Sequence, residues 1–313
     1  MRHPGRPAVR HGVTAAVVAL LLALVLGGLF GCGARGAPPD GRRATAPAQI
    51  PRSPSTGPQR RAAPKPARPW NVHPASVAAL GDSITRGFDA CDPLADCPEV
   101  SWATGSRAGV GSLSSRLPVG TAGWNLAESG ARVGGLTAQA RAAAAHRPAM
   151  VTVLIGANDA CTASVAAMTP VARFRADFTA ALAYLHRVLP DTQILVASIP
   201  DLRRLWSVGR TNVLGRQIWK LGLCPSMLKD AEARTPAADA RRTAVRDRVI
   251  AYNAAMGGAC ARLPRCRYDN GAVFGYRFTT HDLSRWDWFH PNATGEAKLA
   301  ALLAGVAGFR TAK

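Results

Sequence analysis

Short apolar runs alternate with longer helical stretches over residues 76–309, and this alternation constrains the fold more than any other feature. Runs that end at glycine or proline are typical of buried parallel strands. Strands that alternate with helices form right-handed βαβ units, so we predict an α/β fold with a parallel sheet covered on both faces. We expect Thr169 and Pro170 to be the N-cap and first residue of the second helix. The expected strands are 76–80, 122–130, 150–159, 193–200 and 265–274, and the expected helices are 136–147, 171–189, 238–260 and 292–309.

Three candidate functional residues each follow one of these apolar runs. Ser83 comes after the first run, Gly130 after the second and Asn158 after the third. In open parallel sheets, ligands bind beyond the carboxyl ends of the strands. The predicted topology therefore brings residues that are far apart in sequence to one edge of the sheet.

Residues 1–32 have the layout of a secretory signal sequence. Arginines precede an uncharged apolar run over 13–30, which is followed by Gly31 and Cys32. Residues 29–32 also resemble a bacterial lipobox, in which cleavage before the cysteine is followed by its lipidation. Lipidation of Cys32, simple cleavage and an uncleaved anchor remain open, because an apolar run of this length just reaches the minimum for a membrane span. We expect an exported protein, either extracellular or anchored to the outer face of the cell membrane.

Residues 33–73 are expected to form a disordered tether. They are rich in Pro, Ala and Arg and show no apolar periodicity, so they cannot bury enough surface to fold. This leaves one folded domain over residues 74–313. Half of the net charge of +20 lies in the first 70 residues, and the other arginines are scattered. No basic run is interleaved with aromatic residues, so we do not expect a nucleic-acid partner.

Six of the seven cysteines lie in the expected domain. In an oxidising compartment such a set favours disulfides. Two pairs are close in sequence across Pro-containing segments that can turn back, and the remaining two cysteines then pair with each other. A metal site is the alternative, but no Cys-x-x-Cys or neighbouring His pattern supports one. The expected disulfides are Cys91–Cys97, Cys260–Cys266 and Cys161–Cys224.

Four short blocks occur in order: GDSI at 81–84, NLAESG at 125–130, GAND at 156–159 and DWFHP at 287–291. With these blocks the chain resembles the SGNH hydrolases, also called the GDSL esterase/lipase family, over about residues 74–309. The stretches GDSITRGFDA, SWATG and GANDAC look most like the phospholipase B-like branch and the secreted bacterial lipases. The resemblance implies the SGNH hydrolase fold, a three-layer α/β/α sandwich with a parallel, flavodoxin-like sheet, working without metal or cofactor.

The resemblance also implies a role for each block. Ser83 would be the nucleophile and His290 the base that takes its proton. Asp287, three residues earlier, would orient His290, although some relatives use a backbone carbonyl for this. The oxyanion hole would consist of the backbone N–H groups of Ser83 and Gly130 and the side-chain amide of Asn158.

Other polar and aromatic residues near these blocks receive different interpretations. We expect Asp82 and Asp159 to hold loop amides rather than to act as catalytic carboxylates, and two acids without a sugar-binding pattern do not indicate a glycosidase. Trp286, Trp288 and Phe289 would either form an apolar lip for an acyl chain or pack the last loop. The histidines without an acidic partner at catalytic spacing are expected at the surface: His73, His146, His186 and His281.

Together these features predict an exported, monomeric serine esterase or lipase. Its substrates would be carboxylic esters, including lipid or phospholipid acyl esters, and Cys32 or the N-terminal apolar segment would supply membrane anchorage. A carbohydrate esterase that removes acetyl groups from an envelope polysaccharide fits the resemblance equally well. A noncatalytic envelope-binding protein is a further alternative, against which the presence of Ser83, Asn158 and His290 argues. Acyl-chain preference depends on loops that line the pocket.

Overall fold

A computed structural model describes residues 69–309 of the 313-residue chain. The expectations for the signal sequence, Cys32 and most of the tether lie outside the described residues. All described residues belong to the compact unit Ala63–Lys313. Across residues 69–309, no helix combines the length and hydropathy that a membrane crossing requires.

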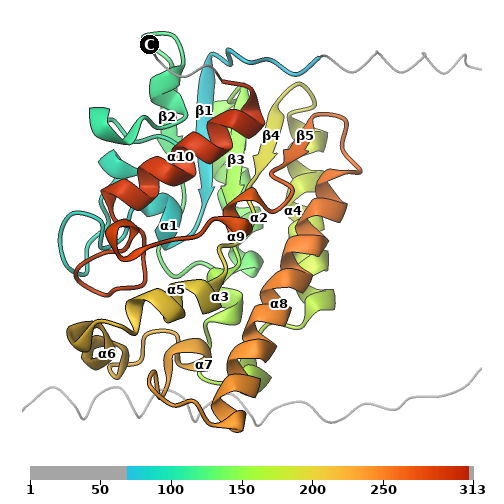
Figure 1. The fold of residues 1–313 in the computed structure, drawn as a ribbon. Coiled ribbons are helices and arrows are strands. Elements are labelled where there is room, and N and C mark those ends of the chain that lie inside the picture. The colour runs from blue at the N-terminus through green and yellow to red at the C-terminus, as the bar shows by residue number, and fades with distance from the viewer. Residues whose placement is uncertain (1–68, 310–313) are drawn as a thin grey trace, which may run out of the picture. The chain divides into compact units, whose positions relative to one another are not determined.

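Residues 69–309 contain a five-stranded parallel sheet with the strand order β2-β1-β3-β4-β5 (Figure 1). Each of the five expected runs contributes a strand, shorter than predicted in most cases. β3 and β4 are buried along their whole length, as a sheet covered on both faces requires. The predicted α/β fold is therefore confirmed. The strands are β1 (Ser76–Gly81), β2 (Ala122–Asn125), β3 (Met150–Leu154), β4 (Gln193–Val196) and β5 (Cys266–Tyr268).

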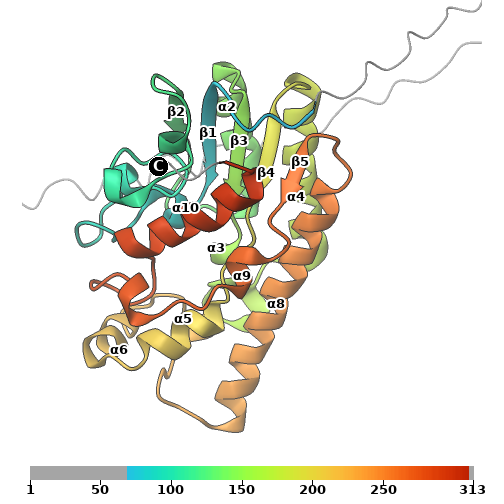
Figure 2. The same cartoon turned by 45° about the horizontal axis from the view of Figure 1, so that its top comes forward.

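Helices cover both faces of this sheet and complete the three-layer sandwich. On one face α4 packs between α2 and α8, while α10 crosses the opposite face (Figures 1 and 2). These four are the helices that the sequence predicts. Their bounds are α2 (Leu136–His146), α4 (Val171–Val188), α8 (Pro236–Cys260) and α10 (Ala293–Ala307).

Shorter helices connect these elements in the described part of the chain. They are α1 (Ser83–Arg86), α3 (Ala157–Ala160), α5 (Leu202–Gly209), α6 (Val213–Trp219), α7 (Pro225–Leu228) and α9 (Ala272–Gly275). Short 3-10 segments lie at Pro98–Val100, Ala108–Val110, Ser114–Arg116, Val133–Gly135, Val165–Ala167 and Thr280–Asp282. Figure 1 shows α3, α5 and α6 beyond the carboxyl ends of the strands, where a ligand site is expected.

The start of α4 differs from the prediction. The helix begins at Val171, Pro170 occupies the cap position, and no side-chain cap bond is formed. The hydroxyl of Thr169 instead donates to Asp159 Oδ1 at 2.7 Å. Asp159 is buried, and a buried carboxylate needs donors more than an exposed helix end does, because water can satisfy the helix end.

The packed part of the chain begins before residue 74. Trp70 Nε1 donates to the carbonyl of Ala307 at 2.9 Å, and the N–H of Asn71 donates to Gln193 Oε1 at 2.9 Å. Trp70 and Asn71, expected in the tether, therefore pack against the last helix and β4.

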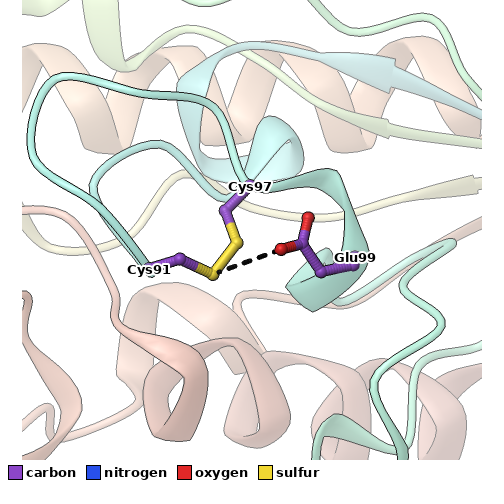
Figure 3. A group of neighbouring side chains, drawn as sticks. All are labelled: Cys91, Cys97 and Glu99. Carbon is purple, nitrogen blue, oxygen red and sulfur yellow. Dashed lines mark hydrogen bonds between the residues drawn. A yellow bond between two sulfur atoms is a disulfide. The ribbon is translucent and has the colours of Figure 1, made fainter.

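Three disulfides join the cysteines of the described residues in the expected pairs. Cys91 is bonded to Cys97, Cys161 to Cys224 and Cys260 to Cys266. Glu99 Oε1 lies 3.6 Å from the sulfur of Cys91 (Figure 3). A disulfide sulfur is neither a thiolate nor a proton donor, so this group of side chains lacks the ligand chemistry of a metal site.

Candidate active site

Ser83 is the first residue of α1 and follows β1 after a tight turn. Gly81, the last residue of β1, has φ +151°, and a Cβ there would lie 2.2 Å from the carbonyl oxygen of Leu154. Gln139 from α2 bonds to both backbone groups of Gly81, accepting at 2.8 Å and donating at 2.9 Å. Asp82 caps α1 by accepting from the N–H of Ile84, which confirms its expected role as a loop acceptor. The close approach of Leu154, the two hydrogen bonds of Gln139 and the cap bond of Asp82 thus fix the backbone next to Ser83.

His290 lies close to Ser83 although the two residues are 207 positions apart. Ser83 Oγ and His290 Nε2 are 2.9 Å apart, a hydrogen-bond distance. The other ring nitrogen of His290, Nδ1, is hydrogen-bonded to Asp287 Oδ2. The structure therefore brings Ser83 of the first sequence block together with Asp287 and His290 of the last block. A carboxylate, rather than a backbone carbonyl, is bonded to Nδ1 of His290.

Asp287 is itself held by the backbone around it. Its Oδ1 accepts from the N–H groups of Phe289 and His290, both at 2.9 Å. The indole N–H of Trp219, from α6, donates to the carbonyl of Asp287 at 2.7 Å. Because Asp287 is buried, the two backbone N–H groups replace water and keep its carboxylate ionised and oriented, while the indole bond positions its backbone.

The electrostatics of this pair favour a charged histidine. Burial alone would lower the pKa of His290, but the charge and hydrogen bond of Asp287 outweigh it and raise that pKa above its ordinary value. Burial opposes ionisation of Asp287 too, yet His290 brings the pKa of Asp287 below its ordinary value. An imidazole whose protonated form is stabilised is suited to accept a proton from a neighbouring hydroxyl group.

Asp89 is a second buried acid beside this pair, and the sequence analysis missed it. Carboxylate oxygens of Asp89 and Asp287 and a ring nitrogen of His290 lie within 4.8 Å of one another. Burial and the charge of Asp287 raise the pKa of Asp89 to about 6. These groups are near enough to share a cation, but both ring nitrogens of His290 are already engaged by Ser83 and Asp287. Asp89 had no signal in sequence, because its neighbours come from the far end of the chain.

Asn158 lies in α3 and is half-buried. One N–H of its side-chain amide donates to the carbonyl of Ala131 at 3.0 Å, which leaves the second N–H of the amide for another acceptor. Asp159 accepts from the N–H of Val133 at 2.9 Å and, as described, from Thr169, so its expected structural role is confirmed. Both side chains thus tie α3 to the loop that carries Gly130.

Gly130 has φ +82°, a left-handed conformation that favours glycine, and is exposed. It is absent from the lining of the pocket described next. The structure therefore brings the loop of Gly130 to the site but does not place this residue against the pocket.

Ser83, Asn158 and His290 line one pocket of about 240 Å³. Its apolar wall includes Leu202 and Leu205 of α5 and the Cys161–Cys224 disulfide. The sequence analysis assigned no element to the segment that carries α5, so these wall residues were missed. The amphipathic spacing of leucine and arginine in LRRLWSVG was the available signal.

The three aromatic residues around His290 divide between the two expected roles. Phe289 lines the pocket, with its ring edge-on to the imidazole at 5.8 Å between centroids. Trp286 lines a second, apolar hollow beside the pocket. Trp288 packs the last loop, since its side chain lies against Gly215 of α6. His73, His146 and His281 are exposed and His186 is half-buried.

The family of the chain follows from comparison with known proteins. A model of the GDSL-like Lipase/Acylhydrolase family matches residues 77–303, which span the strands and the site described above. The chain belongs to this family and is a carboxylic-ester hydrolase. A comparison with curated protein sequences gives no match.

Several solved structures are similar to this chain. An alpha/beta hydrolase from the metagenome of Lake Arreo is 18% identical with a TM-score of 0.49, over 74% of this chain and 94% of that one. A catalytic mutant of an acetylxylan esterase from Geobacillus stearothermophilus is 16% identical with a TM-score of 0.48, over 76% and 96%. An extracellular lipase from Streptomyces rimosus is 18% identical with a TM-score of 0.41, over 74% and 99%. The family assignment rests on the family match and not on these distant similarities.

Proposed function

We propose that this chain is an exported serine ester hydrolase in which Ser83, His290 and Asp287 are the catalytic residues. The observation that carries the proposal is the row of hydrogen bonds from the hydroxyl of Ser83 through the imidazole of His290 to the carboxylate of Asp287. At its Ser83 end, this series of hydrogen bonds reaches the pocket that Ser83 lines. A noncatalytic protein would have no need of a buried carboxylate on the far side of that imidazole.

The first half of the reaction acylates the enzyme. His290 Nε2 takes the hydroxyl proton of Ser83 while Ser83 Oγ attacks the ester carbonyl carbon. The carbonyl π electrons move onto the carbonyl oxygen. The tetrahedral intermediate then collapses, the bond to the alcohol oxygen breaks, and the imidazolium gives its proton to that oxygen. Alcohol leaves and the acyl group remains on Ser83.

The second half returns the enzyme to its starting state. A water molecule replaces the alcohol, His290 takes one of its protons, and the water oxygen attacks the acyl carbonyl carbon. Collapse of this second intermediate breaks the bond to Ser83 Oγ, which recovers its proton from His290. Asp287 keeps the ring in one orientation and stabilises the imidazolium in both halves.

The negative oxygen of each intermediate needs preorganised donors. The N–H of Ser83, the N–H of Gly130 and the free N–H of the Asn158 amide are our candidates. Asn158 has the strongest support, because it lines the pocket with Ser83 and its bond to Ala131 fixes the orientation of its amide.

We also propose that the protein is exported and that Cys32 is its lipid attachment site. The arginine-led apolar segment and the lipobox-like residues 29–32 support this. Radiolabelled palmitate should label the wild type in a bacterial host and should not label Cys32→Ser, which should appear in the medium. An unlabelled wild type with a free mature N-terminus would contradict the anchor.

A serine-reactive fluorophosphonate tests the catalytic assignment. The probe should label the wild type at Ser83 and should leave Ser83→Ala unlabelled, and the same variant should hydrolyse no nitrophenyl ester. An acetylated polysaccharide assayed beside a phospholipid distinguishes the carbohydrate esterase from the lipase. Labelling of Ser83→Ala at the wild-type level would remove the proposed nucleophile.

A further inference from the structure

An apolar hollow of about 830 Å³ lies beside the pocket at Ser83, and no step of the proposed reaction uses it. One wall comes from the segment that begins at Phe88 and includes Pro93 and Leu94. The opposite wall comes from α6 and the turn after it. We call this hollow the side groove; its lining includes Phe88, Leu94, Leu214, Ile218, Leu221 and Trp286.

The side groove adjoins the pocket at Ser83. Gly222 and Leu223 line both hollows, and Asp287 at the base of the groove is bonded to His290. An acyl chain that extends from a carbonyl bound near Ser83 into the groove would run past Gly222 and Leu223. The pocket of about 240 Å³ is large enough for an acetyl group without the groove, so the groove would matter only for acyl chains too long for the pocket.

Large apolar side chains that are exposed to water line the groove, and this exposure is energetically unfavourable. Leu94 is 84% exposed, Leu221 is 83% exposed and Leu214 is 58% exposed, and all three line it. Large apolar side chains gathered on one exposed patch of a soluble domain indicate a binding surface. An acyl chain in the groove would remove this surface from water.

The backbone of Leu94 is also in an energetically unfavourable conformation. Its φ is +56°, in the left-handed region where a leucine is strained and an asparagine or glycine is not. Asp89 accepts from the N–H of Leu94. Leu94 also lies within the ring closed by the Cys91–Cys97 disulfide, which is drawn in Figure 3 and restricts the conformations open to this segment. A strained and exposed leucine is best explained by what it contacts in the working enzyme.

We infer that the side groove binds the acyl chain of the substrate, and that Leu94, Leu214 and Leu221 select esters of medium or long acyl chains. This inference rests on the proposed function of Ser83. The Cys91–Cys97 disulfide then has a part in specificity, because it holds one wall of the groove. Most of the exposed lining of the groove is apolar, although Asp89, Arg285 and Asp287 also line it. A hydrocarbon chain therefore fits its apolar walls better than a polysaccharide, which would need polar partners along its length.

The test compares kcat/KM for nitrophenyl acetate and nitrophenyl decanoate, with the decanoate kept below the concentration at which it aggregates. The full chain should prefer the decanoate. Leu94→Asn relieves the backbone strain while it removes apolar surface, so it should keep or raise the unfolding midpoint and lower the decanoate-to-acetate ratio roughly tenfold. Turnover of the acetate should stay within about twofold, since a single acetyl group does not reach the groove.

Leu214→Asp tests the opposite wall and should lower the same ratio by at least as much. Val119→Asp is the matched control, because Val119 is fully exposed and does not line the groove, and it should leave the ratio unchanged. An unchanged ratio in both Leu94→Asn and Leu214→Asp, with Ser83→Ala inactive, overturns the groove and leaves the proposed function standing. Hydrolysis that survives in Ser83→Ala overturns both.

Discussion

The side chain of Asn158 donates to the backbone carbonyl of Ala131 at 3.0 Å and so joins α3 to the loop that follows β2. An amide held in this way needs no reorganisation when charge develops on a bound carbonyl oxygen. Preorganisation of this kind is what makes an oxyanion donor effective.

Replacement of Asn158 by alanine should therefore act on kcat. We expect a loss of roughly 100- to 1000-fold with little change in KM, as found when one oxyanion donor is removed from a serine hydrolase. Steady-state kinetics on nitrophenyl acetate measure this, and the unfolding midpoint of the variant reports separately on the lost bond to Ala131. A raised KM with an unchanged kcat would mean that Asn158 binds the ground state and not the oxyanion.

The pH dependence of kcat/KM should reflect the raised pKa of His290. Only the neutral imidazole can accept the proton of Ser83, so activity is lost as pH falls through the pKa of His290. Because Asp287 raises that pKa, the midpoint should lie above about 6.5, the value of an unperturbed histidine. The pH profile of residual activity in Asp287→Asn should have its midpoint at lower pH than the wild type. A wild-type midpoint below the unperturbed value would contradict this account.

Loss of the Cys161–Cys224 disulfide should reduce both stability and activity. This bond closes a loop with a sequence separation of 63, for which chain entropy predicts a stabilisation of about 4 kcal/mol. The matched control is the Cys260–Cys266 bond, with a separation of 6 and an expected stabilisation of about 2 kcal/mol. Urea unfolding of the two double Cys→Ser variants should rank them in this order. Only the first should also lose activity, because both of its cysteines line the pocket at Ser83.

Glu296 should make the domain less stable as pH rises. It is fully buried on α10, where it accepts from the N–H of Trp102 at 2.8 Å, and burial raises its pKa well above the ordinary value. The folded state therefore keeps a proton that the unfolded state releases above about pH 4.3, and stability falls with pH from there until the folded pKa is passed. Glu296→Gln keeps an acceptor for Trp102 and removes the titration. Its unfolding free energy should match the wild type near pH 4 and exceed it increasingly at higher pH. A pH-independent difference would show that Glu296 is ionised in the folded state.

The sheet was predictable because its signals are local. The run MVTVLIG, for example, is apolar, β-branched and ends at glycine, and it forms β3, which is followed along the chain by the expected helix α4. The proximity of Ser83 and Asn158 followed from topology alone, since both come after strands of one parallel sheet. His290 and Asp287 follow none of the predicted strands directly, and they were identified from the resemblance of the last sequence block to the SGNH hydrolases.

What the sequence did not predict depends on contacts from distant residues. The short helices α6 and α7 depend on such contacts: α6 lies against Trp288, and α7 begins after Cys224, which is bonded to Cys161. The predicted cap at Thr169 was wrong because Asp159, ten positions earlier, binds its hydroxyl. The burial of Asp89 beside Asp287 and His290, and the side groove, likewise arise only when the last loop packs against the loop at Cys91.

The hydrogen bond between Ser83 and His290 joins the first helix of the domain to the loop before the last one, across 207 positions. During synthesis the nucleophile emerges early and the base late. A chain interrupted anywhere before residue 290 has no proton acceptor for its serine, however much of the sheet has formed. With Ser83 and His290 as the proposed nucleophile and base, ester turnover reports that the chain has been made at least as far as residue 290, and a fragment that ends earlier should not hydrolyse esters.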